Sequence, residues 1–224
     1  FLQRMVAELS TLPQPFLGTV FTLSSHDPFQ IPRAYEGVFP DEGEPLVRCI
    51  GYTDHALGKF FQAAARQPWF EKTLFVITAD HANGRLRPEY RTPVMGFATP
   101  MLLYAPGSDL RGRDETTTVQ QADVLPTVLS LLGYSEPFVA FGSNMFSRRD
   151  PHFAITDYDG MYQLMEGGYV LHHDGERPVA LFDYQHDNFL EHNLLETDPQ
   201  RAAILTRRLE SLLQSYNQRM RENR

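Results

Sequence analysis

The chain has 224 residues, of which 42% are hydrophobic, and 20 basic against 28 acidic residues give it a net charge of −8. This length and composition can bury a sizeable core, so we expect a globular protein with one large domain or one domain plus a small appendage. The acidic balance, without any long block of lysine and arginine, argues against nucleic acid as a partner. The single cysteine, Cys49, cannot form an internal disulfide and is interpreted as a small buried hydrophobic residue.

No apolar stretch approaches the roughly 20 residues that a membrane-spanning helix needs, and no signal-like segment opens the chain. The sequence therefore predicts no anchor or export signal of its own. The chain begins at Phe1, and its first methionine, Met5, falls inside a predicted amphipathic helix. We therefore expect the chain to be part of a longer polypeptide.

The first part of the chain predicts a helix, a strand, a loop and a second helix. Residues 1–10 fit a short helix, and the apolar run 16–24 is typical of a buried strand. Residues 27–47 contain four prolines and show no periodicity, which predicts a surface loop. Apolar residues at helical spacing then predict a helix capped near Thr53 that ends before Pro68.

Two further apolar runs, 73–79 and 100–107, are continuously hydrophobic. Such runs are typical of strands covered on both faces, as in parallel sheets flanked by helices. Asp123 then stands at a helix N-cap position, Pro126 is tolerated in the first turn, and Gly133 follows the last turn. This order of elements predicts an α/β fold with a mainly parallel sheet.

The pattern changes after about residue 150. Short strand-like runs at 152–158, 167–173 and 178–184 are separated by turn residues and predict a small antiparallel sheet. We therefore expect two domains, an α/β domain over 1–150 and a small antiparallel subdomain over 151–224.

A helix is expected to close the chain, with Asp198 and Pro199 as its start signal. Its apolar residues recur at helical spacing, and we interpret them as a packing face and not as a partner site. They are Ile204, Leu205, Leu209, Leu212, Leu213, Tyr216 and Met220.

Asp80 and His81 end the apolar run 73–79 abruptly. Ligands in open α/β sheets bind at the carboxyl ends of strands, and a carboxylate oxygen with an imidazole nitrogen can coordinate a divalent metal. An isolated Asp-His pair is also common as a turn or a helix cap. From the residues alone, both interpretations stay open.

His26 follows the predicted strand 16–24 and would reach the same edge of the sheet if the two strands run parallel. A structural, hydrogen-bonded histidine is the alternative. The arginines that follow His81, namely Arg85, Arg87 and Arg91, could pair with an anionic substrate or could belong to a solvated loop.

Six segments, in this order and at about these spacings, resemble the sulfatase and phosphoglycerol transferase branch of the alkaline phosphatase superfamily, and lipoteichoic acid synthase-like enzymes in particular. They are SSHDPF, GYTDHALGKFF, TLFVITADH, TPMLLYAPG, QQADVLPTVLSLLG and FGSNMF. The resemblance covers nearly the whole chain but only the C-terminal half of the family domain. It implies the C-terminal half of an alkaline phosphatase-like sandwich.

The resemblance also implies roles for individual residues. Asp80 and His81 match the pair that binds the catalytic divalent metal, whose identity among Mn, Zn, Mg and Ca the sequence leaves open. His26 matches a histidine that contacts the phosphate-bearing head group of the substrate. Arg85 is a weaker substrate-binding candidate, which rests on its position after His81 and not on the resemblance. In such proteins the segment that contains Asp123 is largely architectural.

No residue of this chain matches the family's nucleophile, either the metal-bound threonine or the modified cysteine of true sulfatases. The resemblance therefore implies half of an active site, inactive alone, whose nucleophile and remaining ligands lie in the N-terminal half of the same parent protein. It also implies a phosphate- or sulfate-ester substrate and a location on the periplasmic or extracellular face of the cytoplasmic membrane, tethered by N-terminal helices that are absent here. Phosphoglycerol transfer is the favoured activity; the alternatives are a sulfatase or a non-catalytic module that retains the fold.

Overall fold

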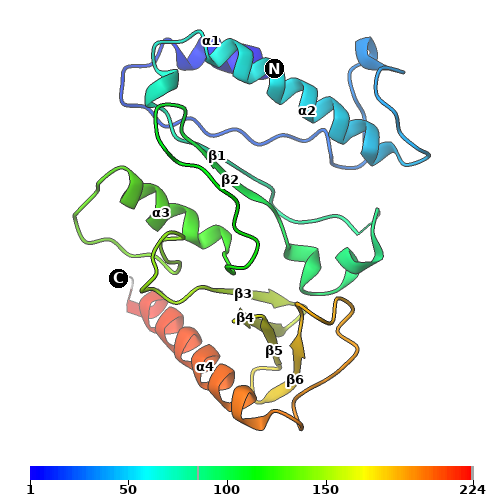
Figure 1. The fold of residues 1–224 in the computed structure, drawn as a ribbon, viewed down its shortest axis with the longest axis vertical. Coiled ribbons are helices and arrows are strands. Elements are labelled where there is room, and N and C mark those ends of the chain that lie inside the picture. The colour runs from blue at the N-terminus through cyan, green and yellow to red at the C-terminus, as the bar shows by residue number, and fades with distance from the viewer. Residues whose placement is uncertain (85, 223–224) are drawn as a thin grey trace. The chain divides into compact units, whose positions relative to one another are not determined.

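The computed structural model describes residues 1–84 and 86–222, which fold into two compact units (Figure 1). Unit 1 consists of Phe1–Ala79 and Pro100–Arg111, and unit 2 consists of Asp80–Thr99 and Gly112–Arg224. The helices and strands, in chain order, are α1 (Leu2–Leu9), α2 (Pro45–Ala64), β1 (Phe75–Thr78), β2 (Met101–Tyr104), α3 (Val124–Leu131), β3 (Phe153–Tyr158), β4 (Met161–Glu166), β5 (Tyr169–His173), β6 (Pro178–Asp183) and α4 (Pro199–Glu222). The predicted domain boundary near residue 150 stays a prediction. None of the helices in the described ranges is long and apolar enough to cross a membrane.

Helices α1 and α2 pack together in unit 1. Leu2 and Val6, one turn apart on α1, are buried against Phe60 and Ala64 of α2 and against Trp69. The prediction of a helix at the N-terminus is confirmed. This packing joins the two helices through one apolar core.

Helix α2 begins at Pro45, about two turns before the predicted cap at Thr53. Proline suits the first helical position because its ring fixes φ and its missing N–H has no partner to lose there. The extra turns place Leu46 and Cys49 in a small core with Phe29. Cys49 is fully buried, as expected, and burial raises the pKa of its thiol.

The expectation of a mainly parallel sheet is wrong for the strands that the structure describes. β1 and β2 pair antiparallel, with Phe75 opposite Tyr104 and Thr78 opposite Met101. A continuous apolar run indicates that a strand is covered on both faces but carries no information about its direction, so the direction could not be read. The α/β class itself is confirmed.

The strand predicted over 16–24 does not form. Its residues are in irregular backbone, and no described residue pairs with them in a ladder. The side chains of Leu17 and Phe21 are 89% and 66% exposed. A strand needs a neighbour that supplies backbone hydrogen bonds, so apolar composition alone does not produce one.

Unit 2 contains a four-stranded antiparallel sheet in the order β3-β4-β5-β6, covered on one face by α4 (Figure 1). Leu164, Leu171 and Leu181 of three neighbouring strands are fully buried against Leu205 and Leu209 of α4. The predictions of a small antiparallel sheet and of a C-terminal helix are confirmed.

Strand β4 was not among the predicted strands. It lies between two tight turns, Asp159-Gly160 and Gly167-Gly168, in which all four residues have positive φ. Such pairs are typical of two-residue hairpin turns, because positive φ at both central positions matches the twist of the strands. These two turn signals, with six residues between them, would have predicted strand β4.

Asp123 and Thr127 are buried and hold the loop that follows α3. The Asp123 carboxylate accepts hydrogen bonds from the backbone N–H groups of Gln120 at 2.9 Å and Ser143 at 2.7 Å. The Thr127 hydroxyl accepts one from the backbone N–H of Met145 at 3.0 Å. The architectural role expected for this segment agrees with these contacts.

Candidate functional site

Asp80 and His81 lie next to each other just after β1. The Asp80 carboxylate accepts a hydrogen bond from the His81 backbone N–H at 2.9 Å, and its other oxygen lies 3.7 Å from His81 Nε2. The two side chains are 57% and 61% exposed. A carboxylate oxygen and an imidazole nitrogen therefore face the same small volume and are accessible from outside.

The second ring nitrogen of His81 fixes its tautomer. His81 Nδ1 lies 2.8 Å from the carbonyl oxygen of Ala82, and a carbonyl can only accept, so Nδ1 carries the proton. In the neutral ring Nε2 then presents its lone pair on the side of Asp80. Metal-binding histidines commonly donate their other N–H in this way, so the pair fits a divalent ion as two of its ligands.

Two ligands do not complete a metal site. Within residues 1–84 and 86–222, no group of three or more His, Cys, Asp and Glu side chains could hold an ion. Structural and catalytic zinc sites use at least three protein ligands. The described residues therefore supply part of a coordination sphere.

The loop between β1 and β2 folds back on itself beside this pair. The backbone N–H of Ala82 donates to the Gly96 carbonyl at 3.0 Å, and Arg91 Nε donates to the Gly84 carbonyl at 2.9 Å. A Cβ atom at Gly84 would lie 2.7 Å from Arg91 Cγ, so glycine permits this close approach. These contacts hold the two ends of the loop together.

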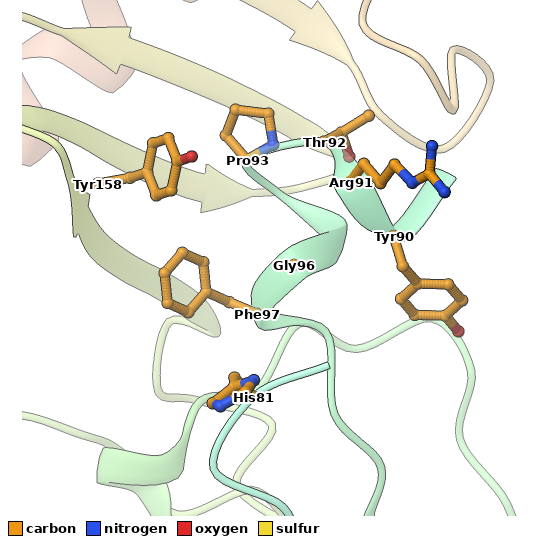
Figure 2. A pocket seen from close by; sticks show the side chains of 8 residues that line it. All are labelled: His81, Tyr90, Arg91, Thr92, Pro93, Gly96, Phe97 and Tyr158. Carbon is orange, nitrogen blue, oxygen red and sulfur yellow. The ribbon is translucent and has the colours of Figure 1, made fainter. Parts of the chain in front are cut away.

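A hollow of about 260 Å³ opens beside His81 (Figure 2). Its lining residues are His81, Tyr90, Arg91, Thr92, Pro93, Gly96, Phe97 and Tyr158. In Figure 2 the Phe97 ring lies between His81 and Tyr158, and the Arg91 side chain points the other way. The Phe97 and Tyr158 ring centroids are 6.2 Å apart with planes at 77°, an edge-to-face arrangement.

The arginines of this loop differ in their contacts. Arg85, the weaker substrate-binding candidate, lies outside the described residues. Arg87 pairs with Glu89 at 3.6 Å, which compensates its charge. Arg91 is exposed, and within the described part of the chain it has no ion-pair partner.

His26 is displayed by a tight turn of unit 1. Its Nδ1 lies 2.8 Å from the Asp27 carbonyl, and its own carbonyl accepts from the Phe29 backbone N–H at 2.8 Å. Phe29 is buried at a positive φ of 54°, which anchors the turn while His26 stays exposed. His26 belongs to unit 1, whereas Asp80 and His81 belong to unit 2, so a shared site stays a prediction.

Sequence reasoning missed Phe97 and Tyr158. They are far apart in the chain, and each stands beside turn residues that carry no chemical signal of their own. Only the packing of the loop against the antiparallel sheet brings their rings together.

Comparison with known proteins decides the family. The family model described as Sulfatase matches residues 1–134, more than half of the chain. The chain belongs to the sulfatase family. The resemblance stated from the six sequence segments is thereby confirmed.

Among sequence relatives of this sulfatase-family chain, the lipoteichoic acid synthase-like protein YvgJ of Bacillus subtilis (strain 168) is 27% identical over 175 residues. The match covers 69% of this chain and 28% of the relative. The chain therefore spans little more than a quarter of the length of this curated relative.

Two solved structures confirm the fold. The lipoteichoic acid synthase LtaP from Listeria monocytogenes superposes with a TM-score of 0.65 at 22% identity, covering 87% of this chain and 52% of that one. A protein in the alkaline phosphatase superfamily from Vibrio parahaemolyticus gives 0.60 at 24% identity, covering 89% and 54%. This chain therefore corresponds to about half of each solved structure.

Proposed function

We propose that this chain is part of a metal-dependent enzyme that hydrolyses or transfers phosphate esters, most closely in the manner of a phosphoglycerol transferase. Membership of the sulfatase family and the similarity to a lipoteichoic acid synthase-like protein support this class of reaction. A sulfatase is the alternative. The observation that carries the proposal is the geometry of Asp80 and His81.

Asp80 and His81 would hold a divalent ion through a carboxylate oxygen and Nε2. When bound, such an ion lowers the pKa of a coordinated hydroxyl and neutralises charge on the ester oxygens. The Ala82 carbonyl keeps the His81 ring oriented by accepting its Nδ1 proton. His26, once protonated, would donate from Nε2 to the anionic group of the substrate, since its Nδ1 is already held by Asp27.

We further propose that the nucleophile and the remaining ligands come from another part of the same parent polypeptide. The two-residue donor set in the described part of the chain and the roughly twofold length of the solved structures support this. A position on the outer face of the cytoplasmic membrane belongs to the same proposal. Native mass spectrometry of the purified protein tests it: we expect a second polypeptide and a chelator-sensitive ion to travel with an active preparation.

Binding of Mn²⁺ to the 224-residue chain, measured by calorimetry and by electron paramagnetic resonance, tests the metal site directly. We expect Asp80→Ala and His81→Ala each to weaken binding by more than about tenfold, because each removes a ligand. The matched control is His186→Ala, since His186 Nδ1 also pairs with a carboxylate, that of Asp183 at 2.9 Å. Equal loss in all three variants, or no loss in the first two, contradicts the proposal.

Phosphate and sulfate can be separated in the same calorimetric experiment. Inorganic phosphate and inorganic sulfate are titrated into the Mn²⁺-loaded chain at equal ionic strength, so that screening is matched. We expect phosphate to bind more tightly. Tighter binding of sulfate favours the sulfatase alternative.

A further inference from the structure

We propose that Phe97 and Tyr158 form a specificity-determining wall that contacts the polyol part of the ester, glycerol or a sugar ring. The anionic group would lie at Asp80 and His81, so this inference rests on the proposed function. It adds a recognition role for two aromatic residues on different segments of unit 2.

The position of the two rings carries the inference. Phe97 and Tyr158 are 40% and 51% exposed, yet they line a hollow and do not stand on a convex surface. In Figure 2 the Phe97 ring and then the Tyr158 ring follow His81, and all three residues line that hollow. Aromatic side chains that converge in a concave site beside polar groups are typical of ligand contacts.

The two residues of the wall stand at the ends of regular elements. Tyr158 is the last residue of β3, directly before the Asp159-Gly160 turn. Phe97 ends the short 3-10 helix η4 (Met95–Phe97). Since both residues end regular elements, their backbone would lose little conformational entropy when a ligand binds the rings.

The loop that carries Phe97 is anchored on the four-stranded sheet. Val94 is buried against Ala154, Met165 and Val170 of the sheet. The fully buried Gln163 donates from Nε2 to the Pro93 carbonyl at 3.3 Å and to the Thr156 hydroxyl at 3.0 Å. The sheet therefore fixes the distance between the loop and β3, and with it the spacing of the two rings.

The chemistry of the lining selects a small polyol. Two aromatic rings and Pro93 offer apolar contact for carbon-bound hydrogens, and the hydroxyl of Tyr158 offers a hydrogen bond to a ligand hydroxyl. A volume of about 260 Å³ is below the usual range for drug-sized ligands, so it suits a single small organic group. Inorganic phosphate has no carbon skeleton and would leave the wall unused.

Calorimetry on the Mn²⁺-loaded 224-residue chain tests the wall with four probes: inorganic phosphate, sn-glycerol 3-phosphate, glucose 6-phosphate and glucose 6-sulfate. We expect the two phosphate esters to bind more tightly than inorganic phosphate, and glucose 6-sulfate to bind less tightly than glucose 6-phosphate. Phe97→Ala and Tyr158→Ala should each reduce that advantage about three- to tenfold and leave the affinity for inorganic phosphate unchanged. Phe146→Ala, which removes an exposed ring outside the hollow, is the matched control and should change nothing.

Comparison of glucose 6-phosphate with sn-glycerol 3-phosphate distinguishes a sugar from glycerol as the polyol. The ester that binds more tightly has the carbon skeleton that fits the wall better. The inference is overturned when the unmodified chain binds esters no more tightly than phosphate. It is also overturned when both variants keep the full ester advantage while circular dichroism shows that they are folded.

Asp80→Ala separates this inference from the metal proposal. It should weaken phosphate and esters by the same factor, so the ratio between them survives. Unchanged Mn²⁺ binding in Asp80→Ala contradicts the metal site but not the wall. The wall is tested by the ratio of ester affinity to phosphate affinity. In that case the ratio is measured again in the presence of a chelator.

Discussion

At the scale of single residues, Asp123 joins two stretches of chain that are twenty residues apart. Its two carboxylate oxygens accept the backbone N–H groups of Gln120 and Ser143 in a buried position. Asp123→Ala would leave both donors without an acceptor, which we expect to lower the free energy of unfolding by about 2 to 4 kcal/mol. Urea denaturation followed by circular dichroism measures the change, and a loss below about 0.5 kcal/mol contradicts it.

Asp123 also makes a prediction about pH. Burial, partly offset by its hydrogen bonds, raises the pKa of this carboxyl in the folded state. Its contribution to stability is therefore complete below the ordinary aspartate pKa of about 4 and is lost as the pH rises through the raised value. We expect the unfolding free energy of the unmodified chain, relative to Asp123→Asn, to be higher at pH 4 than at pH 7; a pH-independent difference contradicts this.

Residues that sequence reasoning could find are those whose signal is local. Asp80 and His81 interrupt an apolar run, and the adjacent pair is visible without any knowledge of the fold. Phe97 and Tyr158 could not be found, because their meeting depends on how the loop seats on the sheet. The orientation of His81 was equally invisible, since it rests on one hydrogen bond to the Ala82 carbonyl.

At the scale of elements, only part of the apolar face predicted for α4 is buried against the sheet. Leu209 is 0% exposed in the core with the sheet, whereas Ile204, from the same predicted stripe, is 58% exposed. We expect Leu209→Ala to cost about 2 to 5 kcal/mol of unfolding free energy and Ile204→Ala to stay within about 0.5 kcal/mol. Thermal and urea unfolding of the two variants measure the difference. Equal losses of unfolding free energy in the two variants contradict the prediction.

The four-stranded sheet carries a histidine that responds to acid. His172 Nε2 lies 3.1 Å from the Gln163 side-chain oxygen, and burial lowers the pKa of the ring. Its contribution to stability is therefore present above the ordinary histidine pKa of about 6.5 and is lost as the pH falls toward the lowered folded value.

We expect His172→Gln, which keeps an N–H donor for Gln163, to reduce the loss of unfolding free energy between pH 7 and pH 5. Urea denaturation at the two pH values gives the measurement. His186→Gln is the control, since the exposed His186 ring lies outside the sheet. The same acid loss in His172→Gln and in the unmodified chain contradicts the prediction.

Helices and the small sheet were predictable as elements, because helical periodicity and turn residues are local signals that a short stretch of sequence contains. The direction of β1 against β2 was not predictable, since it is a property of two segments and their connection. The failed strand at 16–24 has the same cause: its composition is that of a strand, and the described chain gives it no partner.

At the scale of the whole molecule, the order of six segments predicted the alkaline phosphatase-like fold, and this is confirmed. No single segment has that power, because each is short and common. Their order and spacing constrain the path of the chain over most of its length, which is why fold was predictable while the complete active site was not.

Residues 16–24 expose several apolar side chains in one run, including Leu17 and Phe21. Exposed apolar runs without a covering partner drive association, whereas the net charge of −8 opposes it. We therefore expect the 224-residue chain to associate with rising concentration, and more strongly at 0.15 M salt (about 8 Å screening length) than at low salt. Sedimentation velocity at several concentrations measures this.

The double variant Leu17→Ser, Phe21→Ser should shift the chain toward monomer without lowering its unfolding free energy by more than about 0.5 kcal/mol, because neither side chain is buried. Leu132→Ser is the matched control, since Leu132 is exposed in unit 2. Association that persists in the double variant and disappears in the control would assign the contact to the region after α3. Loss of association in the double variant alone assigns it to the run 16–24, the segment that the sequence predicts as a strand and that pairs with no strand in the described chain.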